Sequence, residues 1–254
     1  MGGTVTFKRH YDDPPLEEAI FELFVQPSAP WSAEKSEALA KRLPMFSGKR
    51  EELEDVSVVF QLGPGKSVAQ SVNQASSRTR LWVPEQSRAI QFGAGMCTVN
   101  VRRPYGHFAE HLGTIQDVFA AYLDVTKPHQ IGWVGQRYLN IARLPADSFP
   151  SDYFEMYPRL PPELPQAHRP FAVQVETAKF EQGTTIVNLA LLEFAPDAAV
   201  YTIDIYARSD DTVPLEVDQL MAWQSRAHAS IGSSFELTIT DTARKLFKAV
   251  PCPP

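Results

Sequence analysis

The chain has 254 residues and a mass of 28.4 kDa, enough to bury a substantial core in one domain or in two closely packed halves. Hydrophobic residues make up 44% and charged residues 21%, and no apolar run approaches the roughly 18 residues that a membrane span requires. A net charge of −6 argues against a surface built to neutralise many phosphates. The N-terminal Met-Gly-Gly-Thr-Val-Thr lacks the charged and apolar regions of a signal peptide, which predicts a cytoplasmic protein.

The first predicted strand spans 18–25 and follows a stiff Pro-Pro pair. Its apolar side chains recur at every second position, which is typical of a strand with one packed face. The packed face comprises Ala19, Phe21, Leu23 and Val25, and the other face carries Glu18, Glu22 and Phe24. A helix is predicted over 33–43, with Ser32 as its N-cap and Pro44 after its end.

The rest of the first half predicts a meander of strands followed by a long helix. Gly- and Pro-containing turns, including Gly63-Pro64-Gly65, separate the strands. We expect these strands at 55–62, 79–84, 88–92 and 96–102. The helix spans 107–124, where apolar residues recur every three or four positions.

The second half repeats this order of elements. A strand is predicted at 131–143, then a short helix near 147–156 and a Pro-rich loop over 158–170. Further strands are expected at 171–180, 184–193 and 199–207, and helices at 214–229 and 241–248.

The repeated order predicts an α+β fold built from two β-α-β(3-4)-α units, residues 1–127 and 128–254, packed as one globular unit. Two such units would form an antiparallel sheet with helices on one side, which resembles the saddle fold of the TATA-binding protein. A sheet of this kind has an open face, where we expect a partner to bind.

Two segments carry a resemblance to a known family. They are Tyr11-Asp12-Asp13-Pro14-Pro15-Leu16-Glu17-Glu18-Ala19 near the N-terminus and Arg137-Tyr138-Leu139-Asn140 in the centre. Together they resemble a sporadically distributed family of uncharacterised bacterial proteins of about this length. Its sporadic occurrence implies a defence or toxin–antitoxin context, and the resemblance supplies no residue roles.

The leading hypothesis is a non-catalytic protein-interaction module that uses the open sheet face, because no complete catalytic constellation is evident. Alternation within the strand 131–143 predicts Tyr138 and Asn140 on the open face. Arg137 is expected on the packed face, paired with Glu18 or Glu22 across the middle of the sheet.

His228 is interpreted as the residue that closes the helix 214–229. There its charged form would complement the helix dipole, and a role as general base or ligand-binding residue is the alternative.

A second hypothesis is nucleic-acid binding through the arginines of the first half. Arg78 and Arg80 share a strand face, and Arg88, Arg102 and Arg103 follow within a short span. The acidic net charge weighs against this hypothesis, and a solvated rim is the commoner role of such arginines.

A third hypothesis is a metal-dependent hydrolase. His107-Phe108-Ala109-Glu110-His111 matches H-x-x-E-H, and residues four apart on a helix share a face and can bind zinc together. No third ligand is evident, so a solvated first helical turn is favoured. Cys97 and Cys252 have no partner at metal-ligand spacing, and the sequence predicts no cofactor.

Overall fold

The structure, a computed structural model, describes residues 9–61, 69–159, 161, 163, 171–210 and 213–251, and within these it describes no side chains for 54–77, Phe194 and Pro251. The helices are α1 (Ala33–Arg42), α2 (Phe108–Thr126), α3 (Pro150–Tyr153), α4 (Val217–Thr238) and α5 (Asp241–Leu246). The first-half strands are β1 (Arg9–Tyr11), β2 (Leu16–Gln26), β3 (Arg50–Gln61), β4 (Ala69–Trp82), β5 (Arg88–Gly93) and β6 (Met96–Arg102). The later strands are β7 (Gln130–Pro145), β8 (Ala172–Phe180), β9 (Gly183–Phe194), β10 (Ala198–Ser209) and β11 (Ala249–Pro251).

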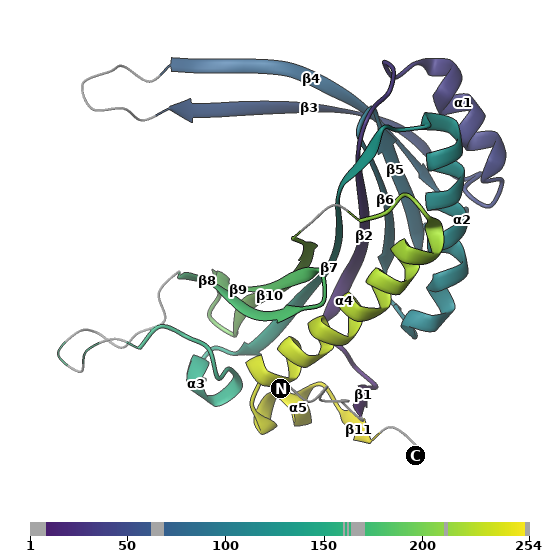
Figure 1. Cartoon of the computed structure of the whole chain (residues 1–254). Coiled ribbons are helices and arrows are strands. Elements are labelled where there is room, and N and C mark those ends of the chain that lie inside the picture. Colours follow the sequence, from purple (N-terminus) through teal and green to yellow (C-terminus); the bar gives the residue numbers. More distant parts are fainter. Residues whose placement is uncertain are drawn as a thin grey trace.

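One antiparallel sheet organises the molecule. Its nine strands lie in the order β3-β4-β5-β6-β2-β7-β10-β9-β8, and β1 and β11 form a separate two-stranded sheet. The helices lie on one side of the large sheet (Figure 1). The predicted α+β class, with helices on one side of an antiparallel sheet, is therefore confirmed.

The strand order is symmetrical about the central pair. β2 and β7, the first long strands of the two halves, pair with each other, and each half then places its remaining strands outward in corresponding order. Among the described residues, the second half contributes one strand fewer to this sheet. The resemblance to the saddle of the TATA-binding protein stays a prediction.

The sheet curves away from the helices, so that its uncovered face is concave (Figure 1). At one end β3 and β4 pair with each other over almost their whole length, whereas β4 pairs with β5 only from Thr79 to Trp82. The outer part of this hairpin therefore projects beyond the sheet as a two-stranded arm (Figure 1).

The core lies between the sheet and the helices. Alternate side chains of β2, namely Ala19, Phe21 and Leu23, are fully buried, as the period-two pattern predicted. Apolar stripes of α2 and α4 pack on the same side of the sheet and include Ile115, Phe119, Leu220 and Trp223. Within the described ranges, no helix has the length and apolar character needed to cross a bilayer.

Helix ends follow local capping signals where these exist. The Ser32 hydroxyl accepts a hydrogen bond from the Lys35 amide at the start of α1, as predicted. The predicted end of this helix at 229 was wrong, because α4 continues to Thr238 and places His228 in its middle. His228 therefore does not complement the dipole at a helix end.

Three sequence features lie outside the described residues: the Gly63-Pro64-Gly65 turn, most of the loop 158–170, and Cys252. Two short strands were not predicted. β1 and β11 come from opposite ends of the chain, and three residues each carry too little pattern to be recognised.

Candidate functional site

Neighbouring residues of β7 point to opposite faces of the sheet, and the predicted assignment of these faces was reversed. The side chain of Arg137 is 44% exposed on the concave face, whereas Tyr138 is 9% exposed and bonds to His228 of α4. Asn140 shares the helix-covered side with Tyr138. The parity of the strand was therefore right, but Tyr138 and Asn140 do not lie on the open face.

On the concave face Arg137 pairs with Asp204 of β10 and not with Glu18 or Glu22 as expected. Its Nε donates to Oδ1 at 2.7 Å and its Nη2 to Oδ2 at 2.8 Å, a bidentate geometry. These bonds raise the pKa of the Arg137 guanidinium, and Asn188 also donates to Asp204 at 3.3 Å. The Arg137 guanidinium of β7 is thus paired with a carboxylate of β10, a neighbouring strand from the same half of the chain.

A second cluster on this face surrounds Glu22 of β2. Burial raises the pKa of Glu22, and a hydrogen bond from Tyr206 opposes that shift. The aromatic rings of Phe24 and Trp133 stack beside it with centroids 3.6 Å apart, and Trp133 meets Tyr206 edge-on at 6.3 Å. The middle of the concave face therefore combines fixed charges with aromatic surface.

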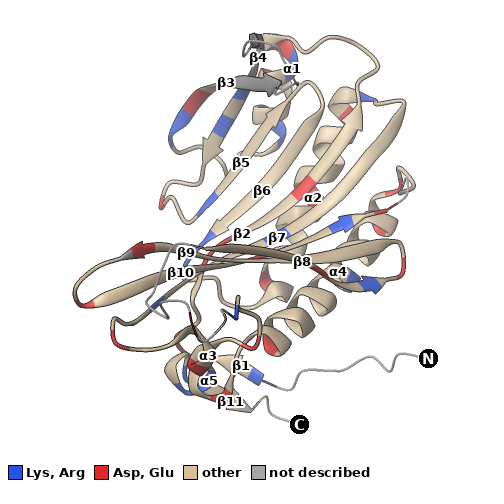
Figure 2. Cartoon of the chain, turned by 90° about the vertical axis from the view of Figure 1, so that its left-hand side faces the viewer, with Lys and Arg blue, Asp and Glu red and all other residues tan. Residues whose placement is uncertain are grey.

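The first-half arginines do not form a common patch. Arg80 pairs with Glu51 at 3.4 Å, Arg103 with Glu17 at 2.8 Å, and Arg88 points to the helix side, where it donates to Thr114. Arg102 lies over the indole ring of Trp82 at 4.4 Å. Arg78 lies on β4 next to Glu51–Leu53 of β3, and it too has interactions within the chain. Figure 2, which looks onto the concave face, shows basic and acidic residues interspersed over the strands.

A cavity of about 680 Å³ lies on the other side of the sheet. Its roof is the segment Arg9–Leu16, here called the strap, and its floor includes Tyr138 and Asn140 of β7. One wall is the middle of α4, and another is the loop 103–107. The volume is within the range of small-molecule pockets.

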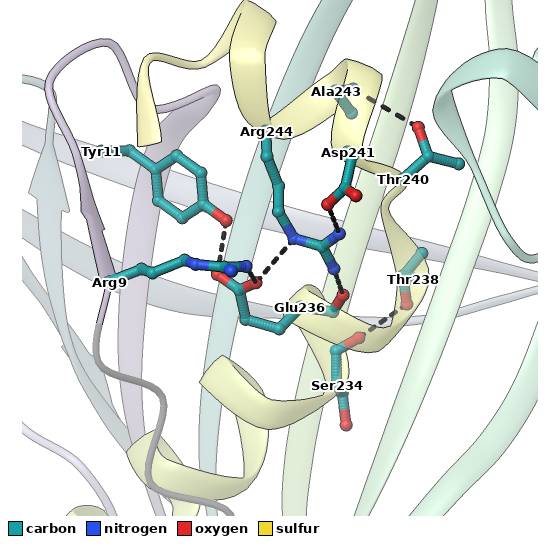
Figure 3. Close-up of polar contacts among 9 residues, drawn as sticks. All are labelled: Arg9, Tyr11, Ser234, Glu236, Thr238, Thr240, Asp241, Ala243 and Arg244. Carbon is teal, nitrogen blue, oxygen red and sulfur yellow. Dashed lines mark hydrogen bonds and ion pairs between the residues drawn. The ribbon is translucent and has the colours of Figure 1, made fainter. Parts of the chain in front are cut away.

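The strap is anchored to α4 and α5, as Figure 3 shows. The Tyr11 hydroxyl donates to the Glu236 carboxylate, which is buried and also accepts from Nε of Arg244 at 3.0 Å. Arg9 adds an ion pair with Glu236 at 3.7 Å. Burial and the bond to Glu236 raise the pKa of Tyr11, so the phenol keeps its proton and remains a donor.

A chain of hydrogen bonds crosses the cavity floor. The hydroxyls of Tyr105 and Tyr138 are 2.7 Å apart, and the Tyr138 hydroxyl lies 2.8 Å from Nδ1 of His228. Gln136 also donates to the Tyr138 hydroxyl at 3.2 Å. Gly106, with φ +68°, forms the turn that carries Tyr105 into this position, a conformation that favours glycine.

The imidazole of His228 is uncharged at neutral pH. Burial lowers its pKa from 6.5 to about 4, and its ring stacks on Phe108 with centroids 4.2 Å apart. A neutral imidazole has one donor and one acceptor nitrogen. If Tyr105 donates to Tyr138 and Tyr138 donates to Nδ1 of His228, both phenol protons have acceptors. In the reverse direction the Tyr105 proton would have none among the described residues, so the ring proton is assigned to Nε2.

The two histidines of the zinc-type motif do not face a common site. Nε2 of His111 is buried against the Tyr105 carbonyl at 2.6 Å, whereas His107 lies beside His10 at the start of α2. In the part of the chain that the structure describes, His, Cys, Asp and Glu side chains do not gather in a group of three or more that could hold a metal ion. Cys97 is buried, and burial raises the pKa of its thiol.

The structure therefore brings together three of the five residues singled out from the sequence. Tyr138, Asn140 and His228 line one cavity, whereas Arg78 and Arg80 lie on β4. Sequence reasoning did not single out Tyr105, Glu236, Asp204 or Tyr206 for these roles. Only Asp204 had a signal, because a charge alternates there with apolar residues in the predicted strand 199–207.

A scan against protein-family models finds no match to the chain. A search of the curated proteins finds none either.

Proposed function

We propose that this protein is a non-catalytic binding module whose concave sheet face engages another protein. The observation that carries the proposal is a broad sheet face that none of the described helices covers, extended at one end by the β3–β4 arm. A broad concave face of this kind suits a macromolecule better than a small ligand.

The chemistry of the face favours a protein over a nucleic acid. Its charges alternate in sign, as in the Arg137–Asp204 pair beside Glu22, and the whole chain is acidic. A phosphate backbone would instead require a continuous basic surface. The partly buried Phe24 and Trp133 supply the aromatic surface that is enriched at protein interfaces.

The test is purification of the tagged protein from its native host after nuclease treatment, followed by mass spectrometry and by reconstitution with the purified partner. We expect a stoichiometric protein partner whose binding is lost in the variant Arg137→Ala/Trp133→Ala. Leu237→Ala, an exposed position on α4, is the matched control on the opposite side and should retain the partner. A chain that elutes alone, or a partner lost only in the control, would contradict the proposal.

A further inference from the structure

We propose that the cavity beneath the strap binds a small uncharged molecule that has an apolar body and carries a carbonyl and an N–H. This site is separate from the concave face, since the sheet lies between them. The inference does not depend on the proposed protein partner.

The polar edge is deduced from two atoms at the cavity floor. Nε2 of His228 is assigned as a donor, and Oδ1 of Asn140 is an acceptor because both N–H groups of its amide donate to the carbonyls of Tyr138 and Ile203. Within the described residues neither Nε2 nor Oδ1 has a hydrogen-bond partner, and neither is among the fully enclosed unpaired atoms. Both atoms belong to residues that line the same cavity, so a ligand that carries a carbonyl and an N–H has a group complementary to each.

Asn140 is rigidly positioned for this role. It is only 4% exposed, it lies on a central strand, and its amide orientation is set by the two backbone carbonyls. Nδ1 of His228 is likewise fixed by Tyr138. Because Oδ1 of Asn140 is not fully enclosed, a ligand N–H at this position would take the place of water.

The ligand is uncharged because the floor of the cavity carries no charged group. The polar groups at the floor are phenols, an amide and a neutral imidazole. Charged groups lie at the rim, where Arg103 pairs with Glu17 and Glu236 with Arg244. A carboxylate placed at the floor would lose its hydration without gaining a cation. The apolar body would lie between the prolines of the strap and the side chains of Ile205, Ile231 and Phe235.

Gly232 of α4 gives a direct way to block the cavity. It lines the cavity, and a Cβ built on it meets nothing within 4 Å, so a larger side chain there would extend into the open space. Gly113 of α2 is equally unobstructed but does not line the cavity. The variants Gly232→Leu and Gly113→Leu therefore form a matched pair, because both replace a helical glycine by a better helix former.

The experiment is ligand-observed NMR and calorimetry with benzamide, with benzoate as the charged analogue that lacks the N–H. We expect benzamide to bind the wild type with a dissociation constant on the order of 1 mM and benzoate to bind at least about tenfold more weakly. Gly232→Leu should abolish benzamide binding, Gly113→Leu should retain it, and His228→Phe should weaken it about tenfold.

Three results would overturn the proposal: no binding of benzamide to the wild type, equal binding of benzamide and benzoate, or unchanged benzamide binding in Gly232→Leu. The comparison of the two compounds uses only the wild-type chain. It therefore decides the question even if a variant fails to fold.

Discussion

The burial of His228 predicts a specific dependence of stability on pH. Its pKa is lowered from 6.5 to about 4 in the folded chain, chiefly because the ring is removed from water. Between these two values the unfolded chain takes up a proton that the folded chain does not, so the free energy of unfolding falls as pH falls from 6.5 towards 4. Each pH unit between the two pKa values changes the free energy of unfolding by about 1.36 kcal/mol, so the loss from about pH 7 to about pH 4.5 is roughly 2 kcal/mol.

Urea unfolding of the wild type and of His228→Gln at several pH values measures this effect. The variant cannot take up the proton, so we expect its stability to fall by about 2 kcal/mol less than that of the wild type over the same pH range. His129→Gln, at an exposed position, is the control and should follow the wild type. Parallel stability profiles for the wild type and His228→Gln would refute the argument that burial of this ring excludes the proton.

Three other substitutions test the charged clusters. Arg137→Ala leaves the buried Asp204 with a weaker set of donors, and urea unfolding should show a loss of about 1 to 2 kcal/mol that Arg137→Lys restores only in part. Glu22→Gln should stabilise the chain by on the order of 1 kcal/mol at neutral pH, because burial raises the pKa of Glu22 and its ionisation lowers the stability of the wild type as pH rises through 4.5. A difference in stability between the variant and the wild type that is the same at neutral and acidic pH would contradict this. Tyr11→Phe removes the bond to Glu236, so we expect a loss of about 1 to 2 kcal/mol and faster hydrogen exchange in the strap, whereas unchanged exchange would show that the strap is held by other contacts.

Element type and order were predictable because the sequence carries them locally. The period-two pattern of β2, the three-to-four-residue stripe of α2 and the Ser32 cap each lie within a short window. The arm was underestimated, because β4 begins at Ala69 and not near 79, and polar residues there conceal the strand pattern. α4 was cut short at 229 because Ser and Gly residues after His228 resemble a helix end, although α4 continues through them.

The candidate site was less predictable, because its residues come from five separate segments. Tyr105 lies in a loop, Glu236 near the end of α4, and the strap before β2; nothing in their local sequence indicates that they meet. The strap also contains β1, whose pairing with β11 joins residues more than two hundred positions apart. Local sequence patterns identify single helices and strands, and they do not indicate which residues far apart in the sequence come into contact.

The reversed assignment of Arg137 and Tyr138 has one physical cause. The sequence correctly placed Ala19 and Phe21 in the core and correctly put their strand beside the strand of Arg137, but it did not provide the register between the two. In the structure Ala19 is opposite Tyr138 and Phe21 is opposite Gln136, so both partners share the buried face. A shift of one residue exchanges the faces of the whole strand. That single unknown, the register of β2 against β7, therefore decided which residues face the cavity and which face the proposed partner.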